Sequence, residues 1–255
     1  MWRRIRIGIL LVVLFVVAAG AWNDRTRTTR WEEPLWVGIF PVNGDGRDET
    51  GRYIAALDQA RFAAIEQFFA AEAAEFGIGL ERPMKMVLYP PLAEPPPRLA
   101  PGTGLPGRIW WSLGLRWYTW RQAGGTPADI RLFVLYHDPA GTDAVGHSLG
   151  LQAGLLGIVN AWATPRQDGP NNVVIAHELL HTLGATDKYD PATNLPLFPQ
   201  GYAEPDATPR HPQTLAEIMG GRIPLAPDEA VMPGSLYEVI VGPETASEIR
   251  WPLSL

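Results

Sequence analysis

The stretch from residue 172 to residue 187 reads Asn-Val-Val-Ile-Ala-His-Glu-Leu-Leu-His-Thr-Leu-Gly-Ala-Thr-Asp. Apolar residues recur in it at steps of three and four, which predicts a helix over residues 172–184 with one face in a core. Asn171 or Asn172 can cap its start. Gly184 can end it, because glycine enters the left-handed conformation at little steric cost. The apolar positions are Val173, Ala176, Leu180 and Leu183.

Two histidines and two acids in this stretch have the spacing of a metal site. His177 and His181 are four residues apart, so on a helix both imidazoles project from the same side, which suits two ligands of one tetrahedral zinc ion. Glu178 is rotated away from direct coordination, where a general base acting on a metal-activated water would stand. If the chain reverses at Gly184, Asp187 can become the third protein ligand and leave a fourth position for water. The pattern predicts a catalytic zinc centre.

Length and composition favour a folded domain with one sizeable core, or a core plus a small lobe. The chain has 255 residues, of which 46% are hydrophobic and 19% are charged. Its formal charge of −6 becomes −9 without the first 21 residues, which hold Arg3, Arg4 and Arg6 and no acid. Such a domain repels phosphate backbones, so we expect no nucleic-acid partner. The absence of cysteine excludes disulfides and thiolate ligands.

Residues 1–22 have the pattern of an export segment. Arginines precede an uncharged run of sixteen residues, 7–22, which as a helix spans about 24 Å. That is short of the roughly 30 Å hydrocarbon thickness and favours a signal peptide, with a small-residue cleavage site at residues 19–21. An N-terminal membrane anchor with Trp22 at the interface is the alternative. Both predict an extracytoplasmic domain, either secreted or periplasmic, or held at the membrane by this segment.

The rest of the chain alternates between strand and helix patterns after a charged connector at residues 23–33. Seven prolines between residues 90 and 106 exclude regular structure there beyond short extended pieces, so we expect a surface excursion. Irregular chain is also expected after residue 187, where prolines recur. Strands are predicted at 35–42, 84–89, 130–136 and 155–163, and helices at 50–76 and from 243 to about 250.

Residues 109–120 are rich in tryptophan. Interleaved aromatic side chains can stack on sugars or bases, but helical spacing favours packing in a core. We therefore predict a core role for these side chains. The four tryptophans are Trp110, Trp111, Trp117 and Trp120.

Two other segments are candidates for binding. The loop that holds His137, Asp138, Asp143 and His147 could bind a second metal ion or calcium, although such side chains in loops are usually only solvated. The predicted strand at 155–163 directly precedes the histidine helix. If it is a sheet edge, its free backbone groups can pair with an extended peptide.

The order His177-Glu178-x-x-His181-x-x-Gly184-x-x-Asp187, followed by a methionine turn, resembles the metzincin clan of zinc endopeptidases. Aspartate in place of the usual third histidine is similar to the snapalysin-type branch. So are the tyrosine two residues later and the sequence Glu-Ile-Met-Gly-Gly at residues 217–221. The resemblance covers the order of elements from 34 to 187 more loosely, and it does not cover the insertion at 90–120.

This resemblance implies an α+β, two-lobed zincin domain over residues 34–255. The upper lobe, 34–187, would hold a mixed twisted sheet, a long backing helix and the active-site helix. The small irregular lower lobe, 188–255, would hold the methionine turn, with Met219 beneath the ligands as a hydrophobic base. Met232 is the rival methionine for that turn.

The predicted activity is zinc-dependent hydrolysis of peptide bonds in a peptide or protein substrate, with Glu178 as general base. Residue 221 is glycine, where some clan members have a tyrosine that stabilises the transition state. Zinc itself, a backbone donor, Tyr189, Tyr202 or Arg222 could take that role. The alternatives are an extracytoplasmic zinc-binding scaffold without catalysis, and a zinc hydrolase that acts on a non-protein amide such as a cell-wall cross-link.

Overall fold

The structure is a computed structural model that describes residues 28–252, apart from 101, 143–145, 147 and 153, together with residues 2, 6–8, 11 and 15. Most of the predicted export segment, residues 1–22, lies outside the described residues and stays a prediction. In the part of the chain that is described, no helix is long and apolar enough to cross a membrane.

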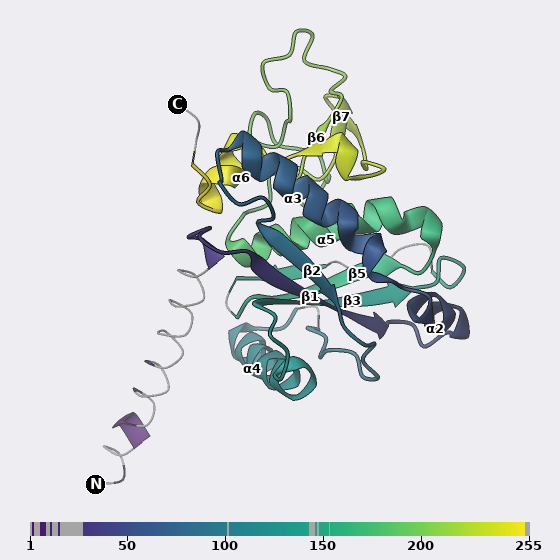
Figure 1. Cartoon of the computed structure of the whole chain (residues 1–255), viewed down its shortest axis with the longest axis vertical. Coiled ribbons are helices and arrows are strands. Elements are labelled where there is room, and N and C mark those ends of the chain that lie inside the picture. Colours follow the sequence, from purple (N-terminus) through teal and green to yellow (C-terminus); the bar gives the residue numbers. More distant parts are fainter. Residues whose placement is uncertain are drawn as a thin grey trace.

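A mixed five-stranded sheet lies at the centre of the molecule, with the strand order β2-β1-β3-β5-β4 (Figure 1). The first four strands in this order are parallel, and β4 runs antiparallel to β5. The parallel strands are nearly continuous apolar runs because both faces of the sheet are covered. The predicted α+β class with a mixed sheet is confirmed. The strands are β1 (Leu35–Asn43), β2 (Met84–Leu88), β3 (Ile130–His137), β4 (Leu149–Leu151) and β5 (Leu156–Trp162).

Helices cover both faces of the sheet, so the molecule has three layers (Figure 1). Side chains alternate across each strand. Ile39 and Leu132 belong to the core under α3 and α5, whereas their neighbours Phe40 and Phe133 belong to a second core under α4. The histidine helix therefore has a rigid apolar support. The helices are α3 (Ala63–Glu75), α4 (Leu105–Ala123) and α5 (Asp168–Leu183).

The helix predicted over residues 50–76 is broken into α2 (Asp48–Ala55), the 3₁₀ turn η1 (Gln59–Phe62) and α3. Asp58 lies at the break, and its carboxylate accepts a hydrogen bond from the backbone N–H of Arg61 at 3.2 Å. Aspartate is favoured at helix starts for this reason. The apolar periodicity correctly predicted helical structure in this region. The prediction of one continuous helix was wrong, because Asp58 caps a new helical turn after α2.

The histidine helix α5 begins at Asp168, earlier than residue 172, so the predicted cap was wrong. Asn171 and Asn172 are buried inside the helix instead. Asn171 exchanges hydrogen bonds with both backbone groups of Trp162 on β5, each at 2.9 Å. Asn172 donates to the backbone carbonyl of Arg61 at 2.8 Å. These two side chains join α5 to the sheet and to η1.

The strand before α5 is not a sheet edge, because β5 pairs with β3 on one side and with β4 on the other. The predicted pairing of this strand with an extended peptide required a sheet edge, so β5 cannot have that role. In the described sheet that edge is β4, a short strand that the sequence patterns did not reveal. Gly150 allows β4 to approach α5 closely, since a Cβ there would lie 2.4 Å from the carbonyl oxygen of Glu178.

Three of the four tryptophans on α4 are exposed, so their predicted core role was wrong. Trp110, Trp117 and Trp120 are 75%, 58% and 73% exposed. Trp111 is half-buried, and its Nε1 donates to the backbone carbonyl of Pro97 at 2.7 Å. The helical spacing was correct, but other residues form the inner face. The buried ones are Leu115, Tyr118, Thr119 and Ala123.

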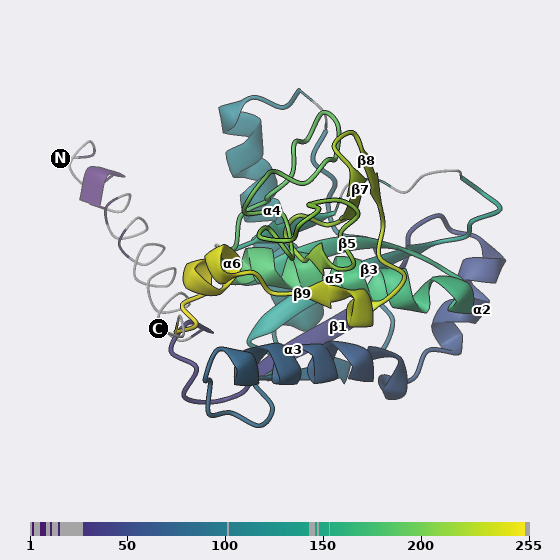
Figure 2. The same ribbon diagram turned by 90° about the horizontal axis from the view of Figure 1, so that it is seen from above.

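The chain after α5 is largely irregular, as its prolines predict, and lies beside α5 and α3 (Figure 2). In it, β6 pairs in parallel with β9, and β7 pairs with β8 in a hairpin. The last helix, α6, begins at Pro243 as predicted. The remaining elements are η2 (Pro165–Gln167), β6 (Ala216–Glu217), β7 (Ile223–Ala226), β8 (Glu229–Val231), η3 (Leu236–Glu238), β9 (Val239–Ile240) and α6 (Pro243–Glu248).

Candidate metal centre

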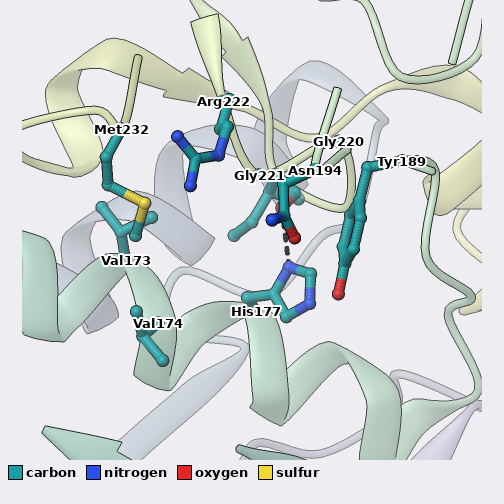
Figure 3. A pocket seen from close by; sticks show the side chains of 10 residues that line it. Val173, Val174, His177, Tyr189, Asn194, Gly220, Gly221, Arg222 and Met232 are labelled. Atoms are coloured by element: carbon teal, nitrogen blue, oxygen red, sulfur yellow. Dashed lines mark hydrogen bonds between the residues drawn. The ribbon is translucent and has the colours of Figure 1, made fainter. Parts of the chain in front are cut away.

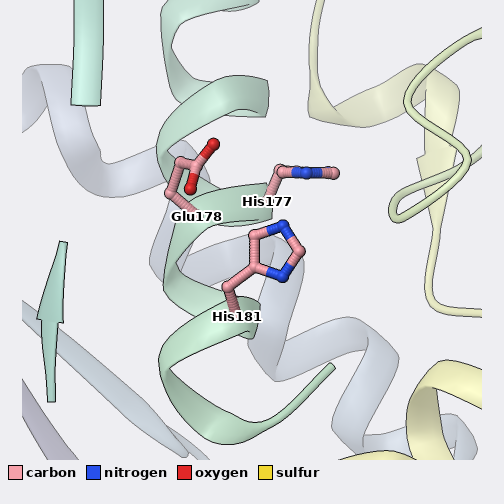
Figure 4. Close-up of side chains that lie close together, drawn as sticks. All are labelled: His177, Glu178 and His181. Carbon is pink, nitrogen blue, oxygen red and sulfur yellow. The ribbon is translucent and has the colours of Figure 1, made fainter. Parts of the chain in front are cut away.

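His177 and His181 project from the same side of α5, one turn apart, as their spacing predicts (Figure 4). Their ring centroids are 4.8 Å apart. The helix ends at Gly184 with a φ of 108°, in the left-handed region that glycine adopts easily. Burial of the apolar stripe sets the rotation of the helix, and so the direction of both imidazoles. The stripe consists of Val173, Ala176, Leu180 and Leu183.

Each imidazole is oriented by a backbone carbonyl. Nδ1 of His177 lies 2.9 Å from the carbonyl oxygen of Ile218, and Nδ1 of His181 lies 2.8 Å from that of Ala185. A carbonyl only accepts, so in both neutral rings Nδ1 carries the hydrogen and donates. A neutral ring would then offer the lone pair of Nε2 to a metal ion, whereas a protonated ring would donate a second hydrogen from Nε2 to Asp187. Metal-binding histidines typically have this second contact, which fixes the tautomer and the ring plane.

Asp187 lies beside both rings after the chain reverses at Gly184. Its Oδ1 is 3.1 Å from Nε2 of His177 and 3.0 Å from Nε2 of His181. In a tetrahedral zinc site with bonds near 2.1 Å, ligand atoms are about 3.4 Å apart. The two distances from Oδ1 of Asp187 are close to this value, as expected for ligands of one ion. Although burial raises the pKa of Asp187, hydrogen bonds and charge from the two imidazoles hold it well below its usual value.

Glu178 is buried against β4 (Figure 4). Its ligand atoms and those of His177 and His181 lie within 4.8 Å of one another, so this group could hold a metal ion. Burial raises the pKa of Glu178, and the charges of the two imidazoles and a hydrogen bond from the backbone of Gly150 offset part of this rise. Among the described residues, Oε2 of Glu178 has no hydrogen-bond partner. A buried carboxylate oxygen in this state is ready to accept a proton.

The predicted methionine turn lies directly against the histidines. Met219 is fully buried, and the preceding residue, Ile218, supplies the carbonyl that orients His177. Gly221 closes the turn by donating its backbone N–H to the carbonyl of Glu217 at 2.9 Å. Met232, the rival, is 43% exposed beyond the β8 strand. Met219 is therefore the buried one of the two methionines, and its role in a methionine turn stays a prediction.

The side chain of Glu217 joins this turn to the last helix. It is fully buried, and burial raises its pKa, which three hydrogen bonds partly offset. Oε2 accepts from the backbone N–H of Gly220 at 2.8 Å. Oε1 accepts from the backbone N–H of Gly242 at 3.1 Å and from Oγ1 of Thr245 at 2.6 Å. No sequence pattern indicated this contact.

A second glutamate, Glu248 on α6, holds the segment around Asp187 on both sides. It accepts from the backbone N–H of Thr186 at 3.0 Å and from its Oγ1 at 2.5 Å. It also accepts from Nζ of Lys188 at 2.7 Å, and that ammonium donates to the carbonyl of Thr186 at 3.1 Å. Although burial raises the pKa of Glu248, these contacts hold it below its usual value. No sequence pattern indicated a role for Glu248 either.

A pocket opens beside His177, and it contains two of the three candidates for transition-state stabilisation (Figure 3). Tyr189 and Arg222 line it, and Tyr189 hydrogen-bonds the carboxylate of Asp187. Tyr202 is not among the lining residues, and its hydroxyl lies 3.2 Å from Nε2 of His211. Asn194, which no pattern indicated, is a further lining residue. The others are Val173, Val174, Ile218, Gly220, Gly221 and Met232.

The predicted second metal site finds no support in the described residues. His137 bonds Asn160 at 3.0 Å, and Asp138 pairs with Arg47 at 2.9 Å. Asp143 and His147 lie outside the described residues. In the part of the chain that the structure covers, the group on α5 is the one cluster with metal-binding geometry.

No family model matches this sequence, and no curated protein matches it. A crystal structure of wild-type OgpA from Akkermansia muciniphila is distantly similar, with 11% identity and a TM-score of 0.39. The match covers 87% of this chain and 62% of that chain. This chain therefore spans less than two thirds of that protein, and so distant a likeness carries no argument about function.

Proposed function

We propose that this chain is a zinc-dependent endopeptidase that acts outside the cytoplasm, with the two-lobed architecture of the snapalysin-type metzincins. One observation carries the proposal. Oδ1 of Asp187 lies 3.1 Å from Nε2 of His177 and 3.0 Å from Nε2 of His181, beside a buried glutamate. Zinc accepts this set of two imidazoles and one carboxylate, and three protein ligands are the number found in catalytic sites.

The chemistry of the donors fits the ion. Both imidazoles present Nε2 to the centre because Nδ1–H of each ring donates a hydrogen bond to a backbone carbonyl. Among the described residues Oε2 of Glu178 has no hydrogen-bond partner, which favours catalysis over a purely structural role, since a buried acceptor without a donor is costly unless water or substrate reaches it. An aspartate ligand leaves one positive charge fewer than three neutral histidines would, so Glu178 matters more as a base.

In the proposed reaction Glu178 moves one proton. A zinc ion bound here would supply a Lewis acid that polarises the substrate carbonyl and acidifies a water molecule. Oε2 of Glu178 takes a proton from that water as the water oxygen bonds to the carbonyl carbon. The same oxygen then gives the proton to the amide nitrogen as the C–N bond breaks, so the products are a carboxylic acid and an amine. The burial that raises the pKa of Glu178 strengthens it as a base.

The surroundings of the centre suit an extended peptide. The edge strand β4 adjoins Glu178 through Gly150, and an edge strand is where an extended peptide can add to a sheet. The pocket beside His177 offers apolar contacts from Val173 and Val174 to one substrate side chain. Tyr189 and Arg222 are the candidates for binding the substrate oxygen, and Tyr202 is set aside because it lies outside this pocket.

The substitution Glu178→Gln tests the proposal, because glutamine keeps the size of the side chain but cannot accept the proton. We expect the purified parent to bind about one zinc ion per chain and to cleave an unfolded protein such as casein. The variant should retain zinc and lose about a hundredfold or more in rate. Glu244→Gln, at an exposed carboxylate on α6, is the matched control and should cleave like the parent.

Three results would contradict the proposal in different ways. Cleavage at the parental rate by Glu178→Gln would remove Glu178 as the base. A parent that binds zinc but cleaves no peptide would favour the scaffold alternative. A parent that hydrolyses only a non-protein amide would favour the alternative of a zinc hydrolase that acts on a substrate such as a cell-wall cross-link.

A further inference from the structure

The helix α4 turns a broad apolar face away from the rest of the molecule. Figure 1 shows it as the outermost layer, on the side of the sheet opposite α3 and α5. Monomeric soluble proteins rarely leave a contiguous apolar face of this kind without a partner. Its members recur at steps of three and four, and each is at least half exposed. They are Leu105, Ile109, Trp110, Leu113, Trp117 and Trp120, here called the α4 face.

The charge on α4 is opposite to that of the chain as a whole. The helix carries Arg108, Arg116 and Arg121 and no acidic residue, whereas the whole chain has a formal charge of −6. Arg108 and Arg121 are exposed, and the guanidinium of Arg121 lies over the ring of Trp117 at 5.5 Å. Tryptophans next to arginines are typical of helices that lie in the interfacial layer of a bilayer. A second copy of the same face would instead bring like charges together.

The chain enters the described domain at the same end of the sheet as the C-terminal end of α4. Trp36, near the start of β1, exchanges two hydrogen bonds with Asp129, which lies shortly after α4 in the chain. The segment before β1 lies on the other face of the sheet, where Nε1 of Trp31 donates to the backbone carbonyl of Ile249 at 2.9 Å. If the uncharged run at 7–22 anchors the chain, it holds the domain at the end of the sheet where α4 also ends.

We infer that the α4 face docks on a lipid bilayer whose headgroups are anionic. The tryptophan and leucine side chains enter the interfacial layer, and the exposed arginines pair with lipid phosphates. This inference is independent of the metal centre, because none of the proposed ligands lies on α4. It gives the domain a fixed orientation at the membrane, with the sheet and α5 behind the contacting helix.

The absence of cysteine in the chain allows one fluorescent label to be placed at a chosen residue. Leu113→Cys places an environment-sensitive dye in the centre of the α4 face and keeps all the tryptophans. Tyr237→Cys, at a side chain that is 84% exposed on η3, is the matched control. Both full-length variants are reconstituted in vesicles of phosphatidylcholine and phosphatidylglycerol. We expect a blue shift of emission, and quenching by nitroxide-labelled lipid, at residue 113 and not at residue 237.

The charge dependence adds a second readout. The shift at residue 113 should diminish in vesicles of phosphatidylcholine alone, and also when Arg108→Gln and Arg121→Gln are added. Equal, water-like emission at both positions in anionic vesicles would overturn the inference. A blue shift at residue 113 that needs no lipid and grows with protein concentration would also overturn it, because a second copy of the chain would then cover the face.

Discussion

The three proposed ligands reach one point from two parts of the molecule that are built differently. His177 and His181 stand on α5, which has ten buried residues and packs against the sheet. Asp187 comes from a segment without regular structure, and Glu248 holds the residues on either side of it. Apolar burial is spread over many side chains, so losing one leaves the rest in place. The polar support of Asp187 is concentrated in a few hydrogen bonds, so single substitutions there should separate the two parts.

The largest loss of folding stability is expected from substitution of Glu217, which links the turn at Met219 to α6. Glu217→Ala leaves the N–H groups of Gly220 and Gly242 and the hydroxyl of Thr245 without their acceptor. Each unsatisfied buried donor costs about 1 to 3 kcal/mol, so we expect a loss of about 3 to 5 kcal/mol in the free energy of unfolding. Urea unfolding of the metal-free protein measures it.

Two further variants sharpen that result. Glu217→Gln replaces one carboxylate oxygen by an NH₂ group that opposes a backbone donor, so its loss should be about 1 to 3 kcal/mol. Glu229→Ala, at an exposed carboxylate on β8, should stay within about 0.5 kcal/mol of the parent. If Glu217→Ala unfolds like Glu229→Ala, burial of Ile218 and Met219 holds the turn and the polar link is dispensable.

The same contrast explains what the sequence could predict. Local periodicity encodes the apolar part, so the four parallel strands, α5 and the reversal at Gly184 were predicted within a few residues. The polar part depends on contacts between distant residues. Thr245 is 28 residues from Glu217, and Thr186 is 62 residues from Glu248. No local pattern encodes such pairs, so neither glutamate could be identified from spacing.

Two other differences have local physical causes. The helix α4 carries tryptophan and leucine around most of its circumference, so periodicity showed that it is a helix but not which side faces the sheet. The edge strand β4 has only three residues and contains Gly150, which has no side chain to give a strand signal. Its position follows from the close contact with α5 that glycine permits. Both features became visible only when the layers were assembled.

A smaller effect, confined to the metal centre, is expected at Glu248. Glu248→Ala releases Thr186 and Lys188 and so loosens the segment that carries Asp187. Outer-shell contacts of this kind typically change metal affinity about 10- to 100-fold, and we expect a loss of zinc affinity in that range. Competition with a chelator measures it. Glu244→Ala, at an exposed carboxylate on the same helix, should bind zinc like the parent. Unchanged affinity in Glu248→Ala would mean that the turn at Gly184 alone positions Asp187.

The smallest effect is the pH dependence of this same contact. Hydrogen bonds and charge from Lys188 and Thr186 outweigh burial and hold the pKa of Glu248 below its usual value of 4.5. A carboxyl group with a depressed folded-state pKa contributes stability above its unfolded pKa and loses it as the pH falls through the folded value. The difference in unfolding free energy between the parent and Glu248→Gln should therefore be full at about pH 6 and shrink below about pH 4.5.

Urea unfolding of the metal-free parent and Glu248→Gln at a series of pH values measures this difference, and groups common to both proteins cancel. Glu244→Gln controls for removing a carboxylate from the same helix. A difference that stays constant into acid would show that neutral hydrogen bonds to Thr186 hold the segment, without help from the charge of Lys188. A difference that vanishes in acid would instead show that the polar part of the centre loosens while α5 stays packed, because the apolar support of His177 and His181 does not titrate.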